Sequence, residues 1–322
     1  MRLIKTAALC AAITPALAAT PALACASCGC TFTSDWLAQG LVTQPGQALT
    51  IRYDYVPQAV LQTDTHRVDT AAIELPPERE IERRTDNHYL TVSYDRQFAN
   101  DWGISVAVPV LWRPHRTIGE DTTEETRSNT HGIGDIRLSA RWQGLSTPKG
   151  VTGLQFGLIL PTGGFHQTFT SGPGAGEVVD RGLQPGSGTT QAVLGAYHYR
   201  RLGSEVALVA QAQVQFALNS REDFRPGTVI EGSTAVQWLG LGKGTIVPQI
   251  QINGRVSVRD RGDNSDRENS GGEQIYVAPG FTAKLNSALS AFANVQVPLY
   301  MRVNGYQLTP RVVLSTGLHA RF

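Results

Sequence analysis

The end of the chain, residues 309–322, alternates between two kinds of side chain. Leu314, Leu318 and Phe322 fall on one side of the alternation, and Ser315 and Arg321 fall on the other. Successive side chains of a β-strand point to opposite faces, so this segment predicts a strand with one apolar and one mostly polar face. Such a strand suits a wall that separates lipid from water.

Eleven earlier segments show strand alternation over lengths that suit tilted membrane spans. The clearest is 205–218, in which Val206, Leu208 and Val214 oppose Gln211 and Gln213. Together with the last segment they predict about 12 strands. The eleven are 49–55, 88–98, 102–112, 133–142, 152–160, 190–200, 205–218, 228–239, 245–258, 273–284 and 289–301.

The connections between these segments alternate between short and long. Five are tight, and the five between them are long and either polar or rich in Gly and Pro: 57–87, 113–132, 162–189, 219–227 and 259–272. Short turns at one end and long loops at the other are typical of an up-and-down barrel in a bacterial outer membrane. We therefore predict an all-β fold, a transmembrane antiparallel β-barrel over residues 47–322 with both termini periplasmic.

The N-terminus has the features of a secretory signal peptide, residues 1–24. Arg2 and Lys5 precede an apolar core over residues 9–17, and Ala22-Leu23-Ala24 offers a cleavage site, with an earlier cut after Ala18 as an alternative.

The formal net charge of the chain is only +1, which argues against a nucleic-acid partner. No later stretch of 18 apolar residues predicts a membrane helix. A mean hydropathy of −0.16 is compatible with a barrel, since half of each strand is polar.

Three cysteines, Cys25, Cys28 and Cys30, lie in a predicted periplasmic segment, residues 25–46. Four interpretations are open. The thiols form a strained, redox-active disulfide with one left over, or they bind a soft metal such as Cu or Zn together with the freed amine of Cys25. Alternatively Cys25 carries a lipid, or the segment serves only in export or assembly. Gly29 follows Cys28 where haem attachment would need a His, which argues against haem.

The polar faces of the predicted strands carry ionisable side chains that would point into the barrel lumen. Rows of such side chains filter solutes by charge and hydrogen bonding, or they pair with one another and fill a narrow lumen. Both alternatives are open. The predicted lumen residues are Arg52, Asp54, Asp95, Asp135, Arg137, Arg141, Arg255, Arg311 and Arg321.

Other features leave further alternatives. The loop 163–188 either folds inward as a constriction or stays mobile. The loop 259–269 is rich in oxygen ligands, but a solvated loop is a better interpretation than a calcium site, because its spacing does not match the usual calcium loop. No nucleophile and base stand at a spacing that predicts an enzyme. Aromatic residues near the strand ends predict two interfacial girdles rather than a soluble core: Trp102, Trp112, Trp142, Trp238, Tyr300 and Tyr306.

Several runs resemble a known family. They are residues 132–138 (Gly-Ile-Gly-Asp-Ile-Arg-Leu), 160–164 (Leu-Pro-Thr-Gly-Gly), 181–189 (Arg-Gly-Leu-Gln-Pro-Gly-Ser-Gly-Thr) and 303–308 (Val-Asn-Gly-Tyr-Gln-Leu). Together they resemble the transporter barrels named after the meta-pathway of phenol degradation. The resemblance is greater to a proteobacterial group whose mature N-terminus reads Cys-x-Ser-Cys-Gly-Cys-Thr. It covers nearly the whole mature chain, and it implies an architecture but no substrate and no site residues.

The closing aromatic residue, Phe322, also resembles the end of outer-membrane barrels, which implies recognition of this strand by the barrel assembly machinery. We therefore expect a channel or transporter-like barrel in the outer membrane of a Gram-negative bacterium, in contact with outer-membrane lipid and passing a small-molecule solute. A metal- or redox-handling protein that uses the Cys cluster and a filled structural barrel are the alternatives.

Overall fold

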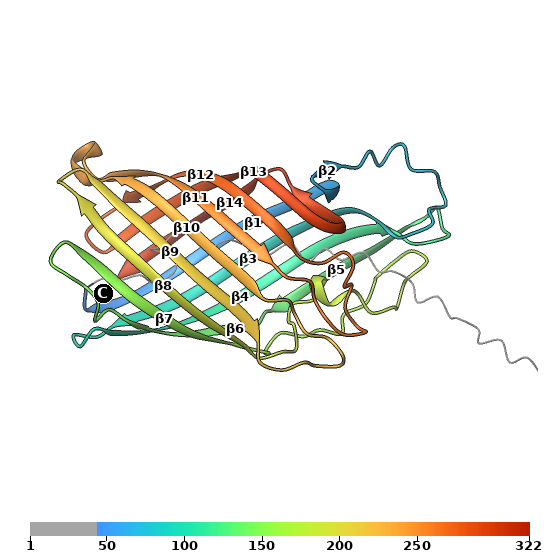
Figure 1. The fold of residues 1–322 in the computed structure, drawn as a ribbon, viewed down its shortest axis with the longest axis horizontal. Helices are drawn as coiled ribbons and strands as arrows, with labels where there is room; N and C mark the ends of the chain where they lie inside the picture. Colours follow the sequence, from blue (N-terminus) through green and yellow to red (C-terminus); the bar gives the residue numbers. More distant parts are fainter. Residues whose placement is uncertain (1–43) are drawn as a thin grey trace, which may run out of the picture.

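A computed structural model describes residues 44–322, and this part of the chain forms a closed antiparallel β-barrel (Figure 1). Twelve strands of the described residues make the wall, in the order β1, β3, β4, β6 and then β7 to β14. β14 pairs with β1 from Ala48↔Arg321 to Tyr55↔Leu314, and this pairing closes the barrel. The predicted fold class and strand number are therefore confirmed.

The elements follow the predicted segments closely in the middle of each strand. They are β1 (Gly46–Asp64), β2 (His66–Arg67), β3 (Ile81–Gln97), β4 (Trp102–Ile118), β5 (Glu125–Ile133), β6 (Ile136–Trp142), β7 (Gly150–Leu160), β8 (Gln191–Leu202), β9 (Val206–Ala217), β10 (Val229–Trp238), β11 (Ile246–Ser257), β12 (Gly272–Lys284), β13 (Leu289–Pro310) and β14 (Val313–Arg321), with the 3-10 turns η1 (Arg181–Leu183) and η2 (Leu241–Gly244).

The two faces of the wall follow the alternation of the sequence. On β11, Ile252 is 47% exposed, whereas its neighbours Gln251 and Asn253 are 1% and 0% exposed. Polar side chains therefore occupy the inside and apolar ones the outside, which is the reverse of a soluble barrel and the arrangement of a membrane barrel. The outward band contains Ile51, Val92, Ile104, Leu158, Leu194, Ile250 and Leu318.

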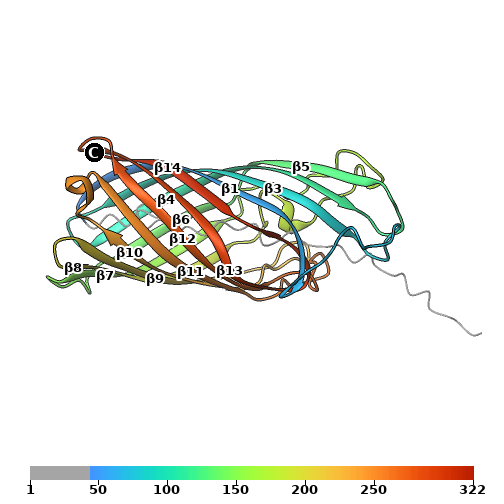
Figure 2. The same ribbon diagram turned by 90° about the horizontal axis from the view of Figure 1, so that it is seen from above.

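The barrel has two different ends, which we call the near rim and the far rim (Figure 2). The near rim holds Gly46 and Phe322, and Gln47 and Phe322 exchange backbone hydrogen bonds of 3.1 and 3.0 Å there. The turns between β3 and β4, β6 and β7, β8 and β9, β10 and β11, and β12 and β13 lie at this rim. The far rim holds the long connections. Within residues 44–322 no helix is long and apolar enough to cross a membrane.

One side of the far rim differs from the prediction, because segments expected as loops are strands. β1 extends to Asp64, and β3 already begins at Ile81. β4 continues to Ile118 and pairs with β5. These strands reach past the others at the far rim (Figure 1). β5 and β6 together form one wall strand that is interrupted at Gly134 and Asp135. These segments carry polar residues on both faces, so their sequence resembles a loop. A strand that extends out of the apolar band can have polar side chains on both faces, because both faces then meet water.

The last pass through the wall begins before residue 309. From Val303 onward β13 pairs with β1, as in Leu61↔Leu308, and a break at residues 311–312 separates it from β14.

The aromatic residues that were predicted to form the girdles lie in different surroundings. Trp102 pairs directly with Trp142, and both lie at the near rim. Tyr306 instead packs against a buried apolar cluster that includes Leu308, so it does not belong to a girdle.

Candidate functional site

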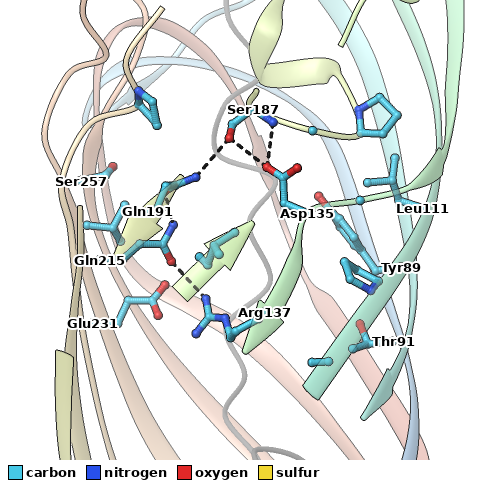
Figure 3. A pocket seen from close by; sticks show the side chains of 18 of the residues that line it. Tyr89, Thr91, Leu111, Asp135, Arg137, Ser187, Gln191, Gln215, Glu231 and Ser257 are labelled. Atoms are coloured by element: carbon cyan, nitrogen blue, oxygen red, sulfur yellow. Dashed lines mark hydrogen bonds between the residues drawn. The ribbon is translucent and has the colours of Figure 1, made fainter. Parts of the chain in front are cut away.

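The lumen contains a cavity of about 400 Å³ toward the far rim (Figure 3). Its wall comes from β1, β3, β4 and β6 to β11, and from the far-rim connections that follow β7, β9 and β11. Ligand pockets in proteins usually range from about 300 to 1,000 Å³, so the space suits one small molecule. Most of the lining residues carry hydroxyl, amide or charged side chains, among them Tyr89, Thr91, Arg137, Gln191, Gln215 and Glu231.

The connection between β7 and β8, residues 161–190, folds into the barrel, and we call it the inner loop. Its turn η1 lies over the cavity in Figure 3. Arg113 donates from Nη1 to the carbonyl oxygen of Gly182 at 2.8 Å, and the hydroxyl of Thr130 donates to that of Leu183 at 2.5 Å. Of the two alternatives for this loop, the structure therefore has the inward constriction.

Asp135 holds both ends of the inner loop. Its Oδ1 accepts from the backbone N–H of Gly163 at 3.0 Å. Its Oδ2 accepts from the backbone N–H and the hydroxyl of Ser187 at 2.9 and 2.8 Å. The two ends cross so closely that a Cβ on Gly163 would lie 2.6 Å from the Cα of Gly186, so glycine is required there. The break between β5 and β6 points this carboxylate inward, where the sequence predicted a lumen residue.

A chain of polar side chains runs down the cavity wall from Ser187 (Figure 3). Gln191 donates from Nε2 to the Ser187 hydroxyl at 3.2 Å, and Gln215 donates to Gln191 Oε1 at 2.8 Å. Arg137 then donates from Nη2 to Gln215 Oε1 at 3.1 Å. This chain links the inner loop to β6, β8 and β9, and it presents both donors and acceptors to the cavity.

A second connection ties the inner loop to the segment between β9 and β10. The Arg181 guanidinium lies 4.1 Å from the ring centre of Phe165 and 5.3 Å from that of Phe224. Its Nη2 also donates to Glu222 Oε2 at 3.3 Å. The hydrogen bond from His166, followed by the cations around it, lowers the pKa of Glu222. Two far-rim segments therefore close over the cavity as one connected structure.

Asp260, in the connection between β11 and β12, also lines the cavity. Its Oδ1 accepts from the backbone N–H of Gly227 at 2.7 Å. Burial raises the pKa of Asp260 to about 6, and the nearby Asp266 acts in the same direction. The carboxyl group therefore titrates close to neutral pH at the edge of the cavity.

Most of the predicted lumen residues lie in ion pairs inside the barrel. Arg52 bonds to Asp54 at 2.7 Å and Arg141 bonds to Asp95 at 3.1 Å. Arg255 bonds to Glu231, a residue that the sequence reading missed because β10 alternates weakly, at 2.6 Å. Oppositely charged pairs lower the net charge that a solute meets.

Asp135 and Arg137 line the cavity, and the last two predicted lumen residues lie at the ends of β14. Arg311 is exposed at the break between β13 and β14, and Arg321 is exposed at the near rim. Both were predicted to face the lumen because they lie on the polar face of the last predicted strand, 309–322. The sequence reading also missed Arg113, which lies one residue beyond a predicted strand end at 112 and contacts the inner loop.

The predicted metal or redox site at Cys25, Cys28 and Cys30 lies outside the described residues, so the Cu or Zn ligand set stays a prediction. Across residues 44–322, no group of three or more His, Cys, Asp or Glu side chains is arranged to hold a metal ion. The predicted signal peptide lies outside the described part of the chain as well.

Comparison with solved structures shows the fold. An outer-membrane channel from Pseudomonas putida F1 matches with a TM-score of 0.64 and 11% identity, over 86% of this chain and 96% of that chain. The transport unit of the autotransporter AIDA-I from Escherichia coli matches with a TM-score of 0.50 and 10% identity, over 88% and 92%. No protein-family model matches the sequence, and the search of curated proteins gave no match. The chain thus has the fold of an outer-membrane β-barrel, and its family stays a prediction.

Proposed function

We propose that the protein is a channel of the Gram-negative outer membrane that passes small polar solutes through its lumen. The observation that carries the proposal is the cavity of about 400 Å³, lined mostly by polar residues, beneath the inward-folded inner loop. The near rim, with its short turns, would face the periplasm, and the far rim would face the outside. The shared barrel fold of an outer-membrane channel supports the outer membrane, and the short turns of the near rim are the basis for the orientation.

The lining suggests how solutes would be selected. Arg52, Asp95 and Arg255 of the lining each bond to an oppositely charged side chain, so these charges are balanced locally. Hydrogen-bonding groups such as Thr91 and Gln215 remain along the cavity wall. Pores of this kind select by size and by hydrogen bonding more than by net charge. We therefore expect small solutes rich in hydroxyl or amide groups, which move by diffusion or by weak binding and release.

The proposal is tested by comparing two tryptophan substitutions on one strand. Thr91 lines the cavity, whereas its neighbour Val92 is exposed on the outward face. Thr91→Trp places a large side chain in the proposed pathway, and Val92→Trp places the same side chain toward lipid. We expect discrete conductance steps from the wild type and the V92W variant in planar bilayers, and a clear loss from T91W.

Gel mobility before and after heating checks that both variants are folded barrels. Uptake of neutral sugars into liposomes should fall as the sugar becomes larger. At each sugar size, uptake should be lower through T91W than through the wild type or V92W. A folded wild-type barrel without conductance steps and without sugar uptake would refute the channel and leave a closed barrel. Equal conductance of T91W and V92W would refute the proposed pathway.

A further inference from the structure

The outer face of the barrel carries an aromatic group below the far-rim extension. It consists of Tyr53, Tyr55, His88 and Trp112, and we call it the aromatic stack. The His88 and Trp112 rings are stacked with centroids 5.0 Å apart, and the Tyr55 and His88 rings with centroids 4.9 Å apart. The Tyr53 hydroxyl lies 2.7 Å from His88 Nδ1. Rings with one polar edge are stable at a membrane interface, so the stack indicates the level at which the apolar band ends.

Above this stack, three arginines stand side by side on neighbouring strands. Arg84 of β3 lies opposite Arg116 of β4, and Arg116 lies opposite Arg127 of β5. We call them the arginine row. Like charges directly opposite each other on a sheet are destabilising. The row is therefore an arrangement that folding alone does not favour.

Nearby carboxylates balance the row only in part. Among the described residues, Asp86 bonds to Arg84 at 2.6 Å, and Glu125 lies 3.0 Å from Arg127 and 4.0 Å from Arg116. The side chains of the three arginines remain 41%, 44% and 59% exposed. One positive charge is in excess, and exposed guanidinium groups can still donate to an anion.

The height of the row above the membrane boundary fits a lipid headgroup. Arg116 follows Trp112 by four residues on β4, which corresponds to about 10 Å of height for a strand tilted by about 40°. Headgroups occupy the layer just outside the hydrocarbon. On the far side of the barrel the strand ends stay apolar, with Ile230 of β10 and Val258 beyond β11 55% and 48% exposed. The row is thus a feature of one side.

We propose that the arginine row and the aromatic stack bind a phosphorylated glycolipid of the outer leaflet. The guanidinium groups would bond to the lipid phosphates in the paired geometry that arginine favours, and the phosphate charge would relieve repulsion within the row. The aromatic stack would contact the sugar and the upper part of the acyl chains. The inference rests on the membrane placement in the proposed function, but not on whether the lumen conducts.

The test uses lipid-free, refolded mature protein in detergent, with bisphosphorylated lipid A and fully dephosphorylated lipid A as probes. Binding is measured by native mass spectrometry. We expect the wild type to bind the phosphorylated form at least tenfold more tightly. The variant R116Q/R127Q should lose that preference, and R116K/R127K should keep part of it, since lysine retains charge but not the paired geometry. R200Q/R201Q, at exposed arginines of the near rim, is the matched control and should bind as the wild type does.

Two further readouts separate binding from a structural role. Without lipid, R116Q/R127Q should melt at the same temperature as the wild type or higher, because repulsion is removed, and its conductance should be unchanged. Equal binding of both lipid A forms, or wild-type binding by R116Q/R127Q, would overturn the proposal. A lower lipid-free melting temperature would assign the row to folding, and full competition by millimolar inorganic phosphate would indicate a free-anion site instead.

Discussion

Asp135→Ala should release the ends of the inner loop. The carboxylate accepts hydrogen bonds from the amides of Gly163 and Ser187 and from the Ser187 hydroxyl. A hydrogen bond to a charged group contributes about 1.5–3 kcal/mol. Water in the cavity can satisfy the freed donors, so we take about 3 kcal/mol for the three together. This corresponds to a roughly hundredfold larger open fraction of the loop ends.

Amide hydrogen exchange measures this opening directly. The amides of Gly163 and Ser187 should exchange about a hundredfold faster in Asp135→Ala, by the same estimate. The amide of Val179 donates to the Gln167 carbonyl within the loop, and it should change little. Conductance should rise, because the constriction moves more freely. Asp263→Ala, at an exposed loop carboxylate, is the control. Wild-type exchange at Gly163 and Ser187 in the Asp135→Ala protein would refute the anchoring role.

Two other predictions concern charge inside the barrel. The pKa of Asp260 is raised to about 6, so its carboxyl favours the folded far rim below about pH 4 and this contribution is lost as pH rises through 6. Protection of the Gly227 amide, corrected for the intrinsic rise of exchange with pH, should fall over that interval. A flat protection profile, or the same fall in Asp260→Asn, would contradict the assignment. Arg141→Met leaves the buried Asp95 without this cation and should destabilise the barrel by about 3–5 kcal/mol in urea unfolding. The double variant with Asp95→Asn should lose less, and additive losses would exclude the pairing.

The sequence was informative about the facing of each strand and less so about contacts. Gln251 and Ile252 were assigned to opposite faces correctly, because alternation is a local property of the strand. The partners of the inward charges were not predictable. Asp95 and Arg141 lie on different strands, and Glu231 was overlooked although it bonds to Arg255. Which charges meet depends on the register between strands, which no single segment contains.

The sequence by itself determined the wall of the barrel. Its alternating segments, joined by short and long connections, place apolar side chains toward lipid, and in lipid the sheet must close because an open edge would leave backbone groups unpaired. Tertiary structure decided the ends and the interior. The backbone groups of a segment such as 113–132 can form hydrogen bonds with water in a loop or with a neighbouring strand. Here the pairing with β4 makes residues 125–133 the strand β5. The inner loop likewise has a polar sequence that suits solvent equally well. Asp135, from another part of the wall, draws it into the lumen, because the loop ends meet a carboxylate that needs donors.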